Sequence, residues 1–269
     1  MPGTARPVLL TGASGALGAM LAARLAEWGW DLVLTDIKPF PGALPPRARF
    51  VLADLCDRAA VAELATGCGA IVHFGGVSTE RPFEEVLGPN IGGLFHIYEA
   101  ARLAGARVIF ASSNHAIGFH ERDSALDADC ELRPDTYYGL SKAYGELMGR
   151  LYWYKHGVEN ISIRIGSGFP EPSTFRMLSS WLSYDDLARL VDAGLRAGDV
   201  GCDIIWGASA NSRTWWRRDA RDRIGWQPRD TADAYAEALS GVVSDDPVTE
   251  RYQGGHLCAR DYTRQRPPP

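Results

Sequence analysis

The sequence predicts an α/β fold, a doubly wound parallel sheet with helices on both faces. Two observations predict it. Several short runs are apolar throughout, which is typical of strands that are buried on both faces of a parallel sheet. Segments with helical spacing lie between most of these runs, and strand–helix alternation implies parallel strands joined by right-handed crossovers. At 269 residues, of which 46% are hydrophobic, the chain is long enough to bury such a core.

Six strands are expected along the chain. Their apolar runs are residues 8–10, 32–34, 50–52, 70–72, 108–110 and 161–165. The helix after the first strand is indicated by Leu17, Leu21 and Leu25, whose four-residue spacing places them on one helix face. A long helix is also expected over residues 141–156.

The charge balance excludes some classes of partner. The chain carries 28 Lys and Arg residues against 33 Asp and Glu residues, a formal net charge of −5. This argues against non-specific binding to nucleic acid or to an acidic membrane surface. No apolar run reaches the roughly 18 residues that a membrane span needs, and the first residues lack the apolar core of a signal peptide.

The cysteines indicate a reducing compartment. Their number is odd and they are scattered along the chain: Cys56, Cys68, Cys130, Cys202 and Cys258. Neither a disulfide framework nor a paired metal-ligand spacing is present, and the histidines show no ligand spacing. We therefore expect a cytoplasmic protein with no metal site.

A glycine-rich turn, TGASGALG at residues 11–18, joins the first strand to the first helix. Gly12 permits the tight turn, Gly15 lets a pyrophosphate approach the backbone, and Gly18 lets helix and strand pack closely. Unpaired N–H groups at the helix N-terminus then face the phosphates. This strand–turn–helix context predicts a Rossmann-type dinucleotide site rather than a simple chain reversal. The residues expected at the cofactor here are Gly12, Ser14, Gly15, Ala16, Leu17 and Gly18.

Acidic residues follow the next two strands. Asp36 stands at the distance from the glycines where a carboxylate accepts hydrogen bonds from the adenosine ribose hydroxyls, and it would repel a 2′-phosphate. We therefore predict NAD rather than NADP, with a turn cap as the alternative role of Asp36. Asp54, followed by Leu55, either meets the adenine amine or caps the next helix. Phe74 and Gly75 end the fourth strand, where they either let the backbone approach the cofactor or serve only a turn.

The composition changes after residue 165. Residues 166–216 hold four of the eight tryptophans, Trp181, Trp206, Trp215 and Trp216. We expect residues 1–165 to form a Rossmann-type dinucleotide-binding domain. Residues 166–265 are expected to form a small substrate-binding lobe rather than more regular sheet, interleaved with the first domain and not independent of it. Residues 266–269 are expected to form a flexible tail.

A tyrosine and a lysine four residues apart, Tyr138 and Lys142, lie on one face of a predicted helix. A phenol has a pKa near 10, so it is a poor base at neutral pH. A neighbouring ammonium stabilises the phenolate, and about 4 kcal/mol of stabilisation lowers the pKa by about three units. Ser113 ends the fifth strand, at the sheet edge where ligands bind. The three groups together are much less expected by chance than Tyr-x-x-x-Lys alone, which is a common helix-surface pair.

These residues resemble those of the extended short-chain dehydrogenase/reductase superfamily, the NAD-dependent epimerases and dehydratases. The resemblance extends over nearly the whole chain and implies the fold and hydride transfer. Longer strings resemble the NAD-dependent uronate dehydrogenases more narrowly: HFGGVS at 73–78, SSNH at 112–115, RIGS at 164–167, PEPSTFRMLS at 170–179 and WGASAN at 206–211. The pair Gly168 and Phe169 departs from this pattern, because a smaller or more polar pair is expected there.

The resemblance implies that galacturonate or glucuronate is oxidised at its anomeric carbon to an aldarolactone, with NAD as the hydride acceptor. Tyr138 would take the proton of the C1 hydroxyl, Ser113 would hold that hydroxyl, and Lys142 would lower the tyrosine pKa and bind the nicotinamide ribose. Arg176 would pair its planar guanidinium with the C6 carboxylate. The other residues implied at the sugar are Ser78, Asn114, His115 and Ser167.

Simpler roles stay open for several of these side chains. Arg176 could be a solvated surface arginine, His115 a structural histidine, and Ser78 and Ser167 turn residues at strand ends. Two other functions also stay open. A nucleotide-sugar epimerase or dehydratase has the same fold but a larger C-terminal region, and a non-catalytic NAD sensor usually lacks the tyrosine and lysine.

Association with further copies is also expected. Relatives on this scaffold often form homo-oligomers through a long helix such as that of residues 141–156. Trp215 and Trp216 are expected in the core of the lobe or in an oligomer contact, rather than stacked against a sugar.

Overall fold

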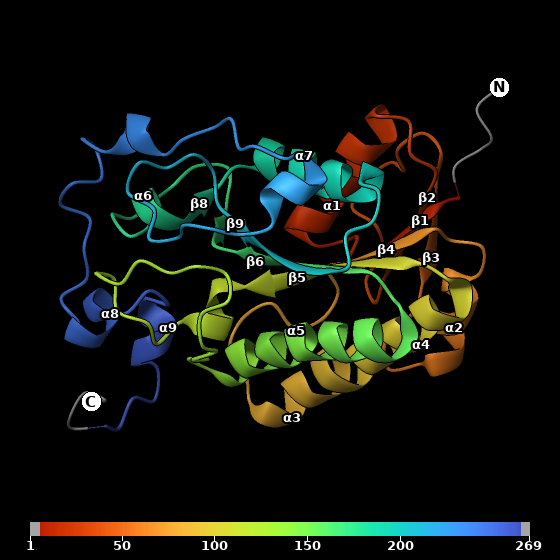
Figure 1. Ribbon diagram of the computed structural model, residues 1–269, viewed down its shortest axis with the longest axis horizontal. Helices are drawn as coiled ribbons and strands as arrows, with labels where there is room; N and C mark the ends of the chain where they lie inside the picture. The colour runs from red at the N-terminus through yellow and green to blue at the C-terminus, as the bar shows by residue number, and fades with distance from the viewer. Residues whose placement is uncertain (1–5, 265–269) are drawn as a thin grey trace.

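The computed structural model describes residues 6–264, whose main element is a seven-stranded parallel sheet with helices on both faces (Figure 1). The strand order is β3-β2-β1-β4-β5-β6-β9, and every neighbouring pair is parallel. The strands are β1 (Val8–Thr11), β2 (Leu32–Asp36), β3 (Ala48–Leu52), β4 (Ala70–His73), β5 (Arg107–Ser113), β6 (Asn160–Ile165) and β9 (Cys202–Gly207). The predicted fold class is confirmed, whereas the tail predicted at residues 266–269 lies outside the described residues.

The central strands are buried on both faces, as their apolar runs predict. In β1, Val8 and Leu10 belong to the core on one side of the sheet and Leu9 to the core on the other. The helices of the first side are α1 (Ala16–Glu27) and α7 (Tyr184–Arg196), and those of the second are α2 (Arg58–Ala65), α4 (Leu94–Ala104) and α5 (Tyr137–His156). Figure 1 shows the two helix layers above and below the sheet.

Helix α5 begins at Tyr137, four residues before the range 141–156 expected for the long helix, and so includes both members of the predicted Tyr138–Lys142 pair. The hydroxyl of Thr136 accepts a hydrogen bond from the backbone N–H of Gly139 at 2.9 Å, which caps the first turn. At the other end, Gly157 adopts a left-handed conformation with φ of 70° and terminates the helix. The early start matters for the site, because it places Tyr138 within the first turn.

The expectation that the stretch after residue 165 adds no regular sheet is wrong. β9 pairs with β6 along its whole length, from Asn160 opposite Cys202 to Ile165 opposite Gly207. The apolar pattern does not predict β9, because Asp203 interrupts the apolar residues of this segment. This carboxylate bonds Arg223 at 2.9 Å, so it is neutralised at the sheet edge rather than left unpaired.

Shorter elements gather beyond the carboxyl ends of the strands, on the left of Figure 1. They are β7 (Ser167–Gly168), α6 (Met177–Ser180), β8 (Trp181–Leu182), α8 (Pro247–Arg251) and α9 (His256–Ala259). On the α5 side lie α3 (Phe83–Val86) and the π-helix η1 (Leu87–Gly93), and η2 (Asn114–Ile117), η3 (Arg221–Ile224) and η4 (Asp233–Tyr235) are single 3₁₀ turns. Within residues 6–264, none of the helices combines the length and the hydropathy of a membrane span.

The tryptophan-rich stretch forms a small core of its own. Trp206 and Trp216 stack with ring centroids 4.9 Å apart, and the guanidinium of Arg164 lies 5.2 Å from the centre of Trp206. Trp215 packs edge-on against Trp216 at 6.4 Å. Trp216 therefore lies in the lobe core, one of the two roles expected for it.

Candidate active site

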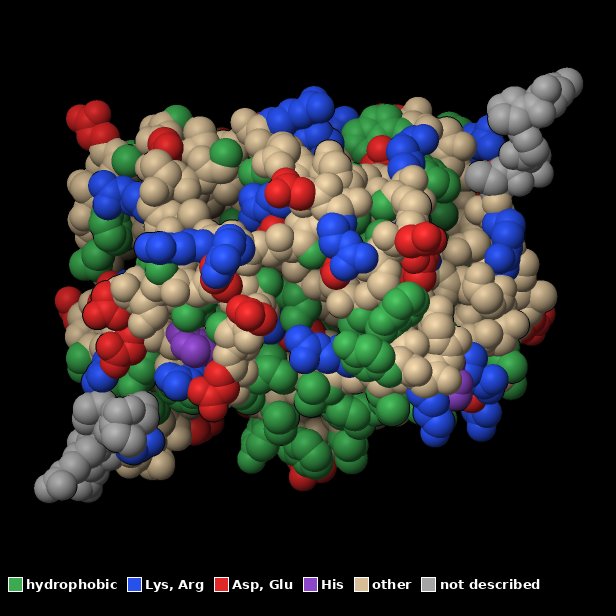
Figure 2. Space-filling model, viewed as in Figure 1, with side chains coloured by type: hydrophobic (Ala, Val, Ile, Leu, Met, Phe, Trp, Pro, Cys, Tyr) green, Lys and Arg blue, Asp and Glu red, His purple; other side chains and the backbone are tan. Residues whose placement is uncertain are grey.

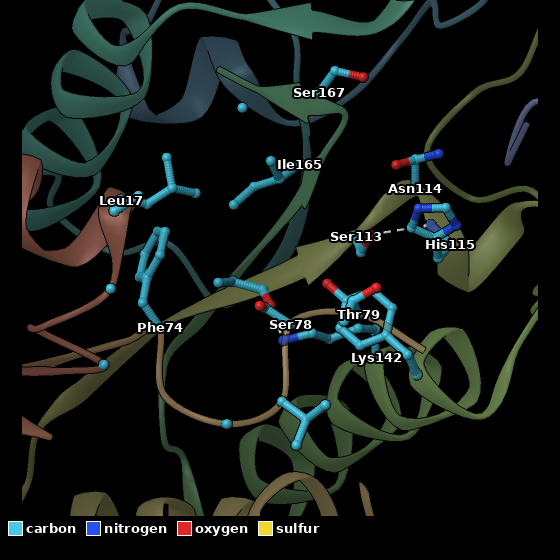
Figure 3. A pocket seen from close by; sticks show the side chains of 18 of the residues that line it. Leu17, Phe74, Ser78, Thr79, Ser113, Asn114, His115, Lys142, Ile165 and Ser167 are labelled. Carbon is cyan, nitrogen blue, oxygen red and sulfur yellow. Dashed lines mark hydrogen bonds between the residues drawn. The ribbon is translucent and has the colours of Figure 1, made fainter. Parts of the chain in front are cut away.

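The carboxyl ends of β1, β2, β4, β5 and β6 open into one cavity of about 1090 Å³. Strand order reverses between β1 and β4, and ligand sites of open parallel sheets form at such a point. Every residue predicted at the cofactor or the substrate lines this cavity. Figure 3 shows Leu17 and Phe74 on one side of it and Asn114 and His115 on the opposite side.

The glycine turn between β1 and α1 has the shape that a dinucleotide requires. Gly12 has φ of 71°, and a Cβ there would lie 2.4 Å from the carbonyl oxygen of Phe74. A Cβ at Gly18 would lie 2.0 Å from the carbonyl oxygen of Gly12, so helix and strand are in direct backbone contact. Gly15 caps α1 without a side-chain bond to the first-turn amides, which leaves them available to a phosphate.

The carboxylate of Asp36 is held at the end of β2 by backbone amides. Its Oδ2 accepts from the N–H of Ser14 at 3.0 Å and its Oδ1 from the N–H of Lys38 at 3.1 Å. The Ser14 hydroxyl donates to the carbonyl of Lys38 at 2.9 Å, which closes the loop around the carboxylate. The negative charge is thus fixed beside the glycine turn, where an adenosine ribose is expected.

Asp54 forms a local turn rather than a helix cap. Its Oδ1 accepts from the N–H of Cys56 at 2.8 Å, whereas Asp57 caps α2 by accepting from Ala59 and Ala60. The expectation that Asp54 caps the next helix is therefore wrong. Asp54 instead lines the cavity.

Leu55 and Gly75 close the cavity wall beside this turn. A Cβ at Gly75 would lie 2.8 Å from Cδ1 of Leu55 and 3.1 Å from the Thr11 hydroxyl oxygen, so no side chain fits there. The Gly75 N–H donates to that hydroxyl at 3.2 Å. The loop after β4 thus lies against β1 and leaves Phe74 to face the cavity.

The predicted tyrosine, lysine and serine meet where β5 ends against the first turn of α5. All three side chains are buried. The Nζ of Lys142 donates to the carbonyl oxygen of Ala111 at 2.7 Å and lies 5.5 Å from the centre of the Tyr138 ring. The Ser113 hydroxyl lines the cavity beside Tyr138 and accepts a hydrogen bond from the backbone N–H of His115 at 3.2 Å.

Burial shifts both titratable groups of this cluster. It raises the pKa of Tyr138 to about 12, with a smaller contribution from the charge of Asp135, while the Ser113 hydrogen bond acts in the opposite direction. Burial also lowers the pKa of Lys142 to about 8. Burial therefore favours the neutral phenol, so nearby positive charge is needed to stabilise the phenolate.

Arg176 lines the cavity next to Asn114, and within residues 6–264 its side chain bonds neutral acceptors. Its Nε donates to the carbonyl oxygen of Gln253 at 2.7 Å and its Nη1 to the Ser167 hydroxyl at 3.4 Å. The Asn114 carboxamide accepts from Nη2 at 2.8 Å in the orientation that also lets it donate to the carbonyl of Ile165. Burial, together with the charge of Arg122, lowers the pKa of Arg176 to about 10. A partly buried cation with neutral partners is suited to an incoming anion.

The other side chains predicted at the substrate line the same cavity as Tyr138 and Arg176. Nδ1 of His115 lies 2.7 Å from Oδ2 of Asp135, and the His115 ring centre lies 5.8 Å from that of Tyr138. The Ser167 hydroxyl lies 3.0 Å from that of Ser180. Ser78 is exposed, on the loop after β4.

The C-terminal segment supplies a wall that sequence reasoning missed. Thr249, Glu250, His256 and Leu257 line the cavity, together with Arg122, which bonds Glu250 and the carbonyl of Thr249. No motif marks these residues, because the C-terminal segment approaches the site only in the folded chain. In the described part of the chain, no three His, Cys, Asp or Glu side chains are placed to hold a metal ion.

Comparison with known proteins agrees with this site. The family model for the NAD dependent epimerase/dehydratase family matches residues 8–176. The uronate dehydrogenase of Pseudomonas putida is 50% identical over 252 residues, which cover 92% of this chain and 94% of that enzyme.

Solved structures give the same result. The crystal structure of uronate dehydrogenase from Agrobacterium tumefaciens has a TM-score of 0.90 at 43% identity, covering 95% of this chain and 97% of that one. A tyrosine-to-alanine variant of that enzyme, complexed with NAD, has a TM-score of 0.89 at 43% identity, covering 94% and 97%. The predicted family is therefore confirmed: the chain belongs to the NAD dependent epimerase/dehydratase family and, within it, to the uronate dehydrogenases.

Proposed function

We propose that this protein oxidises a hexuronic acid at C1 with NAD and releases an aldarolactone and NADH. One observation carries the proposal: a buried phenol beside an ammonium shares one cavity with a partly buried guanidinium that has neutral partners. A cyclic uronic acid has the two groups that such a site needs. Its anomeric hydroxyl is oxidisable, and its C6 carboxylate is the anion that the guanidinium accommodates.

The cofactor end of the cavity fits NAD. The amides at the start of α1 meet the pyrophosphate, and the carboxylate of Asp36 accepts hydrogen bonds from the ribose hydroxyls. Asp54 and Leu55 bind the adenine, and Phe74 and Gly75 border the path to the nicotinamide end. When bound, NAD supplies the hydride acceptor and a positively charged ring.

The chemical step uses the cluster at the start of α5. Ser113 holds the C1 hydroxyl in line with Tyr138, whose phenolate takes the proton of that hydroxyl as the hydrogen on C1 leaves as hydride. The bond from C1 to its exocyclic oxygen becomes a carbonyl, and the existing sugar ring thereby becomes the lactone without loss of any other group. Lys142 lowers the pKa of Tyr138 by its charge and binds the nicotinamide ribose.

Substrate orientation comes from Arg176 and the residues around it. The fork of Arg176 pairs with both oxygens of the C6 carboxylate, since the partners of its Nη groups within residues 6–264 are the neutral Ser167 and Asn114. Ser78, Asn114, His115 and Ser167 meet the ring hydroxyls. A carboxylate there would also relieve the cost of burying the Arg176 charge, which is seen in its lowered pKa.

The test is a direct assay with purified protein. NAD is mixed with galacturonate or glucuronate and the NADH absorbance is followed, while NAD binding is measured separately by fluorescence titration. NADH formation with either sugar is expected. Bound NAD with no NADH from either sugar would overturn the proposal, and it would favour a nucleotide-sugar epimerase or dehydratase if nucleotide sugars are converted, or an NAD sensor if they are not.

We propose further that the protein is a homo-oligomer that associates through α5. Tyr137, Leu140, Leu147, Leu151 and Tyr154 recur at three-, four- and seven-residue spacing on one helix face, and all are exposed. Figure 2 shows hydrophobic side chains gathered on the lower face of the molecule, over α3 and α5. Exposed apolar patches of this kind mark protein contacts. Light scattering after gel filtration should give a dimer or larger assembly, and Leu151→Glu should dissociate it; a monomeric parent protein would contradict the proposal.

We also propose a cytoplasmic location. All five cysteines are free thiols, and those of Cys68 and Cys258 are buried in the fold. Free thiols persist in a reducing compartment. Cell fractionation should recover the protein with cytoplasmic markers, and recovery in the membrane or secreted fraction would contradict this.

A further inference from the structure

A carboxylate outside the predicted site, that of Asp135, is enclosed beside His115. Its side chain is fully buried, directly before the first turn of α5. Three glycines from separate segments surround it: a Cβ at Gly118, Gly139 or Gly254 would lie 1.9, 2.9 or 2.0 Å from a carboxylate oxygen. Any side chain at these positions would occupy the space of the carboxylate, so the backbone closes around it.

Every side-chain partner of Asp135 is a hydrogen-bond donor. The Thr136 hydroxyl donates to Oδ1 at 2.9 Å, and the Cys258 thiol donates to Oδ2 at 3.6 Å. The third contact is His115 Nδ1, 2.7 Å from Oδ2. A carboxylate accepts and does not donate, so the proton of this contact belongs to Nδ1 of His115.

The other ring nitrogen, Nε2, is the one left for the cavity. His115 lines the cavity next to Tyr138, and its backbone N–H donates to the Ser113 hydroxyl at 3.2 Å (Figure 3). With the proton on Nδ1, Nε2 of a neutral imidazole is an acceptor. An acceptor binds a hydroxyl and repels a carboxylate oxygen, which is the opposite preference to that of Arg176.

We propose that Asp135 is a positioning residue that fixes His115 in the tautomer whose Nε2 accepts a hydrogen bond from a sugar hydroxyl. His115 and Arg176 then orient the sugar together, because only one end of a uronic acid suits each of them. The Asp135 side chain itself touches neither substrate nor cofactor. The inference rests on the proposed function, in which His115 faces the substrate.

A double-mutant cycle tests the coupling between the two residues. Asp135→Asn keeps the shape but leaves one acceptor oxygen for three donors, so kcat/KM for galacturonate should fall about 10- to 100-fold. In a His115→Ala background the same substitution should add little, because Asp135 acts through His115. NAD affinity should stay unchanged in all variants, which shows that they are folded. An equal loss in both backgrounds would overturn the inference.

Cys258→Ala is the matched control. It removes another donor from the same Oδ2 atom while leaving the contact with His115, so kcat/KM should be unchanged. A loss equal to that of Asp135→Asn would mean that the carboxylate merely supports local packing. Kinetics of His115→Ala that match those of the unsubstituted enzyme would instead refute the placement of His115 at the substrate, and with it that part of the proposed function.

A spectroscopic measurement needs no variant that could fail to fold. In protein with nitrogen-15-labelled histidine, long-range proton–nitrogen spectra distinguish the two tautomers, and His115→Ala assigns the signals. Nδ1 of His115 should be protonated and Nε2 unprotonated in the NAD-bound enzyme. A neutral ring with its proton on Nε2 would overturn the inference.

Discussion

The two ends of the cavity differ in whether backbone or side chains line them. The cofactor end is mainly backbone, in which one short loop turns its amides inward and glycines keep the space clear. The substrate end is made of side chains, above all the buried Tyr138 and Lys142 and the partly buried Arg176, whose pKa values burial shifts. Nucleotide binding therefore depends mainly on local backbone geometry, whereas the substrate end holds charges whose burial destabilises the fold. Substitutions of Tyr138 and Arg176 should therefore leave NAD affinity intact.

Tyr138→Phe should have the largest effect. It removes the only atom of this side chain that can take a proton, so kcat should fall about 100- to 10,000-fold. NAD affinity should be nearly unchanged, because the phenolic oxygen is not part of the glycine loop. Steady-state kinetics and a fluorescence titration measure both quantities. A kcat close to that of the unsubstituted protein would remove Tyr138 from the chemistry.

Arg176→Ala should come next. The loss of a two-pronged contact with a carboxylate costs about 2–4 kcal/mol, which corresponds to a rise in KM for the uronate of roughly 30- to 1000-fold. Arg176→Lys retains the charge without the planar fork, so its KM for the uronate should lie between those of the unsubstituted protein and Arg176→Ala. If KM for galacturonate is unaffected in both variants, the carboxylate binds elsewhere.

Lys142 shows most directly that burying a charge at the substrate end lowers the free energy of unfolding. Its pKa falls from 10.5 to about 8 on folding, so between these pH values the unfolded chain binds more protons and the free energy of unfolding rises with pH. Below pH 8 the buried ammonium is destabilising. Lys142→Met should therefore abolish activity yet raise the free energy of unfolding of the NAD-free protein by about 1–3 kcal/mol at pH 7.

Urea unfolding at several pH values checks this result. The advantage of Lys142→Met should shrink between pH 8 and 10.5 and be lost above it, because the folded lysine is already neutral and the unfolded lysine then loses its proton as well. A variant that is less stable at pH 7 would show that the ammonium stabilises the fold, and an advantage independent of pH would show that the buried charge is not its cause.

Asp36→Ala should have the smallest effect, and it acts at the other end. The loss of hydrogen bonds to the ribose should lower kcat/KM for NAD about tenfold, and removal of the negative charge should raise it for NADP. KM for the uronate should not change, whereas Arg176→Ala should raise that KM and leave the affinity for NAD unchanged. An unaltered preference for NAD would assign the discrimination to other residues.

The same contrast explains which features could be predicted from the sequence. The glycine turn and the Tyr138–Lys142 pair were recognisable because the geometry of a turn or a helix fixes residues so close in sequence. The hydrogen-bond partners of Arg176 could not be predicted, since its Nε bonds the carbonyl of Gln253 from a distant segment. Asp135 was missed for a similar reason: its burial depends on Gly118 and Gly254, which approach it only in the folded chain.

The most direct measurement is a crystal structure of the enzyme with NADH and the aldarolactone bound. We expect the phenolic oxygen of Tyr138 within hydrogen-bond distance, about 3 Å, of the oxygen on C1, and the carboxylate against the guanidinium of Arg176. A lactone bound in the reverse orientation, with its carboxylate at Tyr138 or C1 remote from the phenol, would contradict the proposed chemistry.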